Sequence, residues 1–199
     1  MAEIKSTMEK VLERAARMGG GPAVDLDAEE QMKDGMRLGA AWLRDEASDL
    51  AQRLAGLDGA VRRHVQRGVV QTLLRNIFLP RDAEQIRQAT RAMEGLAVVG
   101  QSHGELLMVC GEMQKILDHY LQHRDQLRQQ LEGQFARQME MMEKTLAQQT
   151  GMAMKLSPAQ HPKFQEEWQR LQGELNQQYG RALDQHKQLI EQRLIQMQA

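Results

Sequence analysis

Two long segments, residues 104–150 and 163–197, contain no proline and carry apolar side chains mainly at alternating steps of three and four. This spacing places the apolar residues on one face of an α-helix. The stretch between them, residues 151–162, holds Gly151, Pro158 and Pro162, which are residues that interrupt helices. Two long amphipathic helices joined by one short break can bury their apolar faces against each other. The sequence therefore predicts a long antiparallel helical hairpin, coiled-coil-like, with its turn near residues 151–162.

The spacing also predicts which residues meet across the hairpin. Successive steps of four, which locally relax a supercoil, occur once in each segment, at Leu131–Phe135–Met139 and at Leu171–Leu175–Tyr179. If these two stretches face each other, Phe135 lies opposite Tyr179 and Leu127 lies opposite His186. The shorter segment alone would extend about 50 Å. A wider apolar stripe from Leu183 to Met197 indicates that a third surface, supplied by the N-terminal helices, packs against that end.

Composition favours an all-α protein throughout. Aromatic residues make up 4% of the chain and β-branched residues are scarce, whereas good helix formers dominate and only four prolines interrupt them. Helices are expected over residues 2–18, 28–55, 60–79 and 82–99, with Gly35 and Gly39 weakening the start of the second. Three domains follow: an N-terminal helix with a Gly-Gly-Gly-Pro linker at 1–22, a bundle of short helices at 23–103, and the hairpin at 104–199.

Several classes of protein are disfavoured by composition. A net charge of −1 argues against a globally basic nucleic-acid binder. The single cysteine, Cys110, cannot form an internal disulfide and fits a small buried apolar position. The first residues lack the apolar core of a secretory signal, and no apolar run approaches the roughly 20 residues of a membrane span. The sequence predicts a soluble, cytoplasmic protein.

Catalytic constellations are equally sparse. Ser102 and His103 are neighbours in a loop rather than members of a triad. The glycines do not form a phosphate-binding loop, and Glu29 and Glu30 lie in a polar stretch. We therefore expect a protein that is not an enzyme and uses no cofactor.

Two kinds of side chain are candidates for binding a metal or a partner. His119 and His123 stand four residues apart on one helix face, which supplies half of a metal site. His186 could add a third ligand, although a solvated pair of surface histidines is the favoured interpretation. Met152 and Met154 lie at the expected tip of the hairpin, where Met side chains could adapt to a partner or fold back onto the helices.

An arginine-rich stretch spans residues 62–91. Clustered guanidinium groups can bind phosphates or other anions if they face one way. The alternative is a solvated helix face that balances acidic neighbours, and no aromatic residues are interleaved as nucleic-acid binding often requires. The candidate anion-binding residues are Arg62, Arg63, Arg67 and Arg75, followed by Arg81, Arg87 and Arg91.

The first fourteen residues, MAEIKSTMEKVLER, resemble the opening of an uncharacterised bacterial family of all-helical proteins, a domain of unknown function. The resemblance is confined to this N-terminal segment and carries no chemical motif. It implies a bacterial, cytoplasmic protein and no particular activity.

The sequence leaves three hypotheses for function. The leading one is a non-enzymatic structural or adaptor protein whose hairpin binds a protein partner or a second copy of the chain. The first alternative is a chaperone-like or stalk hairpin that grips clients at its Met-bearing tip. The second is nucleic-acid binding through the arginine-rich segment.

Overall fold

The computed structural model describes residues 26–46, 49–101, 103–150 and 161–196, and the regular structure within them is entirely α-helical. The predicted all-α class is confirmed. The helices are α2 (Leu26–Leu43), α3 (Leu50–Ala55), α4 (Gly59–Arg75), α5 (Ala83–Val99), α6 (Gly104–Thr150) and α7 (Pro162–Gln196). The helix expected over residues 2–18 lies outside the described residues.

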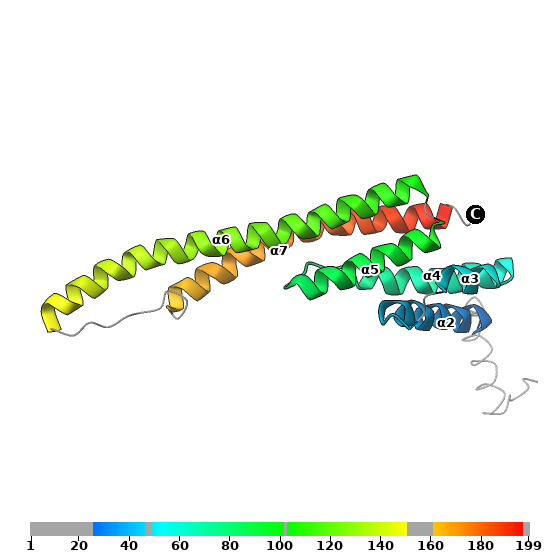
Figure 1. Ribbon diagram of the computed structural model, residues 1–199, viewed down its shortest axis with the longest axis horizontal. Coiled ribbons are helices and arrows are strands. Elements are labelled where there is room, and N and C mark those ends of the chain that lie inside the picture. Colours follow the sequence, from blue (N-terminus) through cyan, green and yellow to red (C-terminus); the bar gives the residue numbers. More distant parts are fainter. Residues whose placement is uncertain (1–25, 47–48, 102, 151–160, 197–199) are drawn as a thin grey trace, which may run out of the picture.

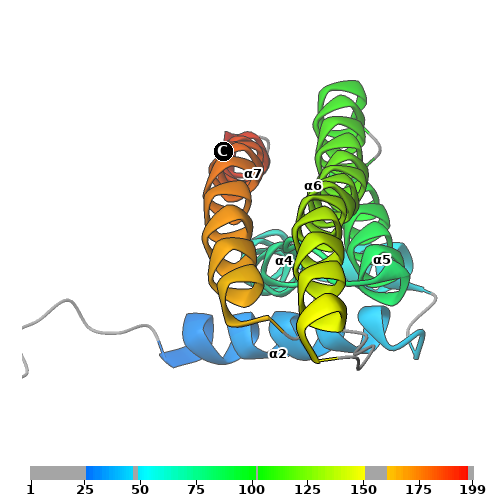
Figure 2. The same cartoon turned by 90° about the vertical axis from the view of Figure 1, so that its left-hand side faces the viewer.

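The helices form layers at one end of an elongated molecule (Figure 1). Viewed along the long axis, α6 and α7 lie above α4 and α5, and α2 lies beneath them (Figure 2). Towards the other end, α7 is the one described helix beside α6, and α6 continues past the beginning of α7 (Figure 1). We call the layered end the base, and we call residues 125–150 of α6 with residues 162–175 of α7 the distal arm.

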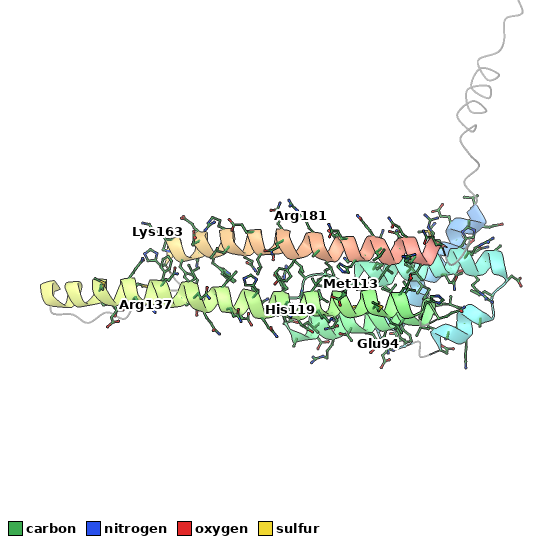
Figure 3. The ribbon with its side chains drawn as sticks, turned by 90° about the horizontal axis from the view of Figure 1, so that it is seen from above. Glu94, Met113, His119, Arg137, Lys163 and Arg181 are labelled. Carbon is green, nitrogen blue, oxygen red and sulfur yellow. The ribbon has the colours of Figure 1, made fainter. Side chains whose placement is uncertain are left out.

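The apolar core belongs to the base. All six described helices, α2 to α7, contribute buried side chains to one cluster, in which α2 is represented by Trp42, α6 only up to Leu117 and α7 only from Leu183. Ile190 and Leu194 are also buried there, and Met113 lies between α6 and α7 (Figure 3). The expectation that a third surface packs against the C-terminal part of the chain is therefore confirmed for these residues.

Helices α2 and α4 approach each other closely through glycines. A Cβ atom added at Gly35 would lie 2.0 Å from the Val65 carbonyl oxygen, and one added at Gly68 would lie 2.0 Å from the Met32 carbonyl oxygen. The threonine hydroxyl of Thr72 also lies 3.5 Å from a carbonyl of α2. Gly35 thus permits the contact that holds α2 against α4, and its cost in helix propensity is offset by this packing.

The helix expected over residues 28–55 is wrong as a single element, because α2 ends at Leu43 and α3 begins at Leu50. Asp45 adopts a left-handed conformation with φ of 61°. Its N–H donates to the Trp42 carbonyl at 3.1 Å, and the next N–H, that of Glu46, donates to the Ala41 carbonyl at 2.9 Å. This bonding pattern is a Schellman motif in which aspartate takes the position usually held by glycine.

The end of α2 is fixed to α5 through one arginine. The Arg91 guanidinium lies 3.8 Å from the centre of the Trp42 ring and forms an ion pair with Asp45 at 2.7 Å. The Trp42 indole Nε1 donates in return to the Arg91 carbonyl oxygen at 2.9 Å. This reciprocal contact explains why the chain turns after Leu43 rather than continuing as a helix.

Other helix boundaries agree with the local sequence signals. Asp82 caps α5 by accepting a hydrogen bond from the Gln85 N–H at 2.9 Å, as a helix-initiating aspartate should. The two long helices occupy residues 104–150 and 162–196, close to the ranges expected from apolar spacing. Helix α4 is shorter than expected and ends at Arg75, several residues before Pro80.

Contacts between α6 and α7 contradict the predicted register. Tyr179, expected opposite Phe135, packs instead against the Tyr120 ring at 5.6 Å between centroids. Phe135 packs against Phe164 with ring centroids 5.5 Å apart. At the base end of the pair, the Arg193 Nε lies 3.4 Å from a carboxylate oxygen of Glu105. Partners on α7 therefore lie about fifteen residues earlier than predicted.

Within the described part of the chain, no helix has both the length and the apolar composition that crossing a membrane would require.

Candidate binding site

Helix α4 is unusual in its charge. Its seventeen residues include four arginines and neither aspartate nor glutamate. Most arginines outside α4 pair with a nearby carboxylate, as Arg37 does with Asp34 at 2.8 Å. By contrast, Arg63, Arg67 and Arg75 form no ion pair among the described residues. Unpaired guanidinium groups are therefore concentrated on this helix.

Arg62 differs from its neighbours because it holds the chain together locally. Its Nη2 donates to the carbonyl oxygens of Ala55 at 2.7 Å and Leu57 at 2.9 Å. These carbonyls lie at the end of α3 and in the turn that follows, so the guanidinium fastens that turn to α4. Two of the five guanidinium N–H groups of Arg62 are therefore engaged within the fold.

One cleft, about 450 Å³ in volume, lies where α4 meets α2 and the C-terminal part of α7. Arg63, His64 and Arg67 contribute its basic side chains, and Glu191 contributes one carboxylate. Its apolar lining comes from one residue of α2, one of α4 and one of α7: Met32, Val70 and Leu194. The cleft thus combines an apolar floor with a basic edge.

A second cleft of about 400 Å³ adjoins the first and shares Arg63 and Leu194 with it. It is also lined by Arg62, Val99 and Gln101. We call the two clefts together the α4 trough. It follows α4 from Gly59 to Gln71, a helical distance of about 18 Å.

Two residues that line the α4 trough each carry one buried polar atom without a hydrogen-bond partner in the described structure. The atoms are the Nε of Arg62, a residue of the second cleft, and the Oε1 of Gln71, a residue of the first. Leaving such a group buried and unpaired costs about 1–3 kcal/mol, so it is uncommon unless a water or ligand satisfies it. One atom needs an acceptor and the other needs a donor.

The remaining arginines of the 62–91 stretch do not join the trough. Arg87 forms an ion pair with Glu84 on its own helix, and Arg91 is engaged with Trp42 and Asp45 at the end of α2. Arg75 is exposed but lies outside both clefts. The structure therefore brings together Arg62, Arg63 and Arg67 only.

The two histidines considered as metal ligands have different surroundings. His119 is exposed, whereas His123 is half-buried with its Nδ1 3.4 Å from the Tyr179 hydroxyl. His186, the suggested third ligand, does not lie beside these two histidines. It lies near Glu112, about three helical turns from His123. Across the described residues, no group of three or more His, Cys, Asp or Glu side chains is arranged to hold a metal ion.

Polar and aromatic side chains meet in the middle of the α6–α7 contact. The Tyr120 hydroxyl donates to the Asn176 Oδ1 at 2.7 Å while the Tyr120 ring packs edge-on against Tyr179. Burial raises the pKa of the Tyr120 hydroxyl, and the nearby charge of Arg124 opposes that rise. Arg124 itself donates to the Arg81 carbonyl at 2.8 Å, which docks the α4–α5 loop onto α6.

The distal arm contains a third cleft, about 600 Å³ in volume, between α6 and α7. Leu127 and Phe135 of α6 and Leu171 of α7 line it, and all three are only half-buried. Gln130, Gln134, Lys163, Glu166 and Glu167 surround them. The apolar faces of the two helices are therefore incompletely covered by each other in this region. Met152 and Met154, the expected tip residues, lie outside the described residues.

Several lining residues were not anticipated from the sequence. Met32, His64, Gln71, Glu191 and Leu194 come from three helices and meet only through tertiary packing. The one usable signal was the absence of acidic residues from residues 59–75, which distinguishes this helix from the other long ones.

Residues 51–192 match a family described as a family of unknown function (DUF6657). The match covers α3 to α6 and nearly all of α7, but not the N-terminal segment on which the resemblance was noted. No curated protein and no solved structure matches the chain.

Proposed function

Since the chain belongs to the DUF6657 family, whose function is unknown, we propose a role from geometry alone: a non-enzymatic structural or adaptor protein of the cytoplasm. In this proposal α6 and α7 act as a long antiparallel, coiled-coil-like hairpin. The base is a scaffold that fixes one end of the hairpin, and the distal arm binds a helix of a protein partner. A second copy of the chain supplies that helix in the simplest assembly.

The half-buried apolar lining of the distal cleft carries this proposal. Leu127, Phe135 and Leu171 face a cleft of about 600 Å³ over which no third described helix lies. Two helices leave part of an apolar stripe in water, and a third helix placed over the cleft would remove it. Burying apolar surface stabilises association by about 25 cal/mol per Å² before the costs of ordering.

Polar residues at the edges of this cleft suit a helical partner. Lys163 and Glu166 are exposed beside it, and Gln130 lies on the opposite edge. Charged and amide side chains flanking an apolar seam are the arrangement that sets orientation and partner choice in helical assemblies. The distal arm therefore offers both an apolar contact and the means to select its register.

Light scattering coupled to size-exclusion chromatography tests the proposal. The wild-type chain should elute as a dimer or co-purify with a partner protein, and the double variant Leu127→Glu/Leu171→Glu should lose that association. The matched control, Gln126→Glu/Gln169→Glu, adds the same charge at exposed positions of the same helices and should leave the assembly unchanged.

Two results would contradict the adaptor role. One is a wild-type monomer that captures no partner in a cross-linked pull-down. The other is an assembly that survives the Leu127→Glu/Leu171→Glu change while circular dichroism shows the helices intact.

A further inference from the structure

The α4 trough lies in the base, away from the distal arm, and the adaptor role does not account for its chemistry. We infer that it is a second docking site, which takes a short acidic peptide segment carrying at least one apolar side chain. The inference extends the proposed adaptor role by naming the chemistry of a partner at a separate surface.

Charge is the first argument for this occupant. Arg63 and Arg67 are exposed at the edge of the trough and have no carboxylate partner in the described structure. Arg62 adds a third positive charge, whereas Glu191 is the single carboxylate in the lining. A carboxylate brought to Arg63 or Arg67 would form a charge-assisted hydrogen bond, which is stronger than a neutral one.

The apolar floor is the second argument. Met32, Val70 and Leu194 line the first cleft, and Val99 joins Leu194 in the second. Val70, Val99 and Leu194 are already buried by the fold, whereas Met32 is half-buried and is the apolar side chain that an occupant would cover. A peptide with alternating acidic and apolar side chains would place one kind on the basic edge and the other on the floor.

The mixed polar character of the lining favours a peptide over other polyanions. Beside its arginines the trough is lined by the amide side chains of Gln66, Gln71 and Gln101, which can both donate and accept hydrogen bonds. A peptide backbone offers both kinds of partner through its N–H and C=O groups. A phosphate backbone supplies acceptors only, and no Phe, Tyr or Trp lines either cleft to stack on a nucleic-acid base.

The length of the trough sets the size of the segment. Its extent of about 18 Å along α4 corresponds to about five or six residues of extended chain. Peptides of this size commonly bind through a few anchoring side chains rather than through total buried area.

The test uses random octapeptides displayed on phage and selected on the immobilised full-length chain. Enriched sequences should contain aspartate or glutamate together with an apolar residue. A synthetic, fluorescein-labelled peptide of the most enriched sequence is then titrated with the chain by fluorescence anisotropy. The variant Arg63→Gln/Arg67→Gln should weaken its binding at least tenfold, because both charge-assisted contacts are lost.

Arg75→Gln is the matched control. It removes an unpaired, exposed arginine from the same helix but from outside the trough, so the affinity should stay within twofold of wild type. Thermal unfolding followed by circular dichroism establishes that each variant is folded.

Three outcomes would overturn the inference: no enriched peptide, enrichment of peptides without acidic residues, or an affinity indifferent to Arg63→Gln/Arg67→Gln. A labelled 20-nucleotide single strand that binds the chain and is lost in the same variant would also overturn it in favour of nucleic acid. The two proposals fail separately, because Leu127→Glu/Leu171→Glu should leave peptide binding intact and Arg63→Gln/Arg67→Gln should leave self-association intact.

Discussion

At the crossing of α2 and α4, the absence of a methyl group at two positions determines how closely the helices approach. The atoms that a Cβ would meet at Gly35 and Gly68 belong to the backbone, with a carbonyl oxygen nearest in each case, and the backbone cannot rotate away as a side chain can. Gly133 provides a contrast on α6, because a Cβ there would meet nothing within 4 Å. The same residue type is therefore required at one site and dispensable at the other.

Gly68→Ala should destabilise the protein by about 2–3 kcal/mol, because the added methyl group forces α2 away from α4. Gly133→Ala should instead stabilise it by about 0.5–1 kcal/mol through better helix propensity. Urea unfolding monitored by circular dichroism gives both values. Equal effects of the two substitutions would contradict the close packing of α2 on α4.

Cys110 provides a titratable probe of the core. It is buried against α5, with its Sγ 3.9 Å from the Met93 carbonyl oxygen. Burial raises the pKa of the thiol from 9.0 to about 11, because the thiolate would lose its hydration. The sequence-based expectation of a small buried apolar position is confirmed.

The free energy of unfolding should therefore fall between pH 9 and 11. The thiol favours its protonated form in the folded state, so its contribution is complete below the unfolded pKa and is lost as pH rises through the folded one. Comparing wild type with Cys110→Ala isolates this contribution, expected at about 1–2 kcal/mol, from other groups that titrate there. A pH dependence of the unfolding free energy identical in the two proteins would contradict this contribution of Cys110.

Alkylation of Cys110 by iodoacetamide at pH 8 should likewise be slow until urea is added.

At the scale of helices, sequence signals located the ends of α5, α6 and α7 well, but they located the break after α2, the end of α4 and the pairing of helices poorly. Asp82 and the long proline-free segments fixed α5, α6 and α7 to within one or two residues. The turn after Leu43 was not predicted, because it depends on Asp45 in a left-handed conformation and on Arg91, which is distant in sequence. No local sequence pattern predicts a contact between residues so far apart in the chain.

The register of α6 on α7 could not be obtained from apolar spacing for a related reason. The error of about fifteen residues is close to two heptads, so the apolar stripes match almost equally well in both alignments. Specific contacts break this degeneracy, namely the Tyr120–Asn176 hydrogen bond and the Glu105–Arg193 ion pair. The α4 trough was missed likewise, since its lining combines residues from α2, α4 and α7.

Pairs of introduced cysteines distinguish the two registers. In a Cys110→Ala background, Phe135→Cys/Phe164→Cys should cross-link efficiently with a short bismaleimide, because the rings that these cysteines replace lie in contact in the wild-type chain. Phe135→Cys/Tyr179→Cys should not, because fifteen residues of helix separate the positions by about 22 Å. The measurement is the fraction of internally cross-linked monomer on a denaturing gel. Efficient linkage of the second pair alone would restore the register expected from the sequence.

At the scale of the whole molecule, stability is distributed unevenly along the long axis. The base surrounds its core with helices from several directions, and the core cluster ends at Leu117 on α6 and at Leu183 on α7. Beyond Arg124, which contacts the α4–α5 loop, α7 is the one described neighbour of α6 (Figure 1). A pair of helices without a third neighbour derives less of its stability from burial. The distal arm is therefore the part best able to reorganise around a partner.

Hydrogen–deuterium exchange should reveal this gradient in the chain without a partner, for which the Leu127→Glu/Leu171→Glu monomer serves. Amides near Met113 and Ile190, both fully buried, should exchange only through global unfolding. Amides near Leu127 and Leu171 should exchange through local opening, at least tenfold faster, because their side chains are half-buried. A partner bound over the distal cleft would slow the second group and leave the first unchanged. Uniform protection from Met113 to Leu127 in a Leu127→Glu/Leu171→Glu monomer would show that the arm is stable alone. The reason for assigning it a partner would then be lost.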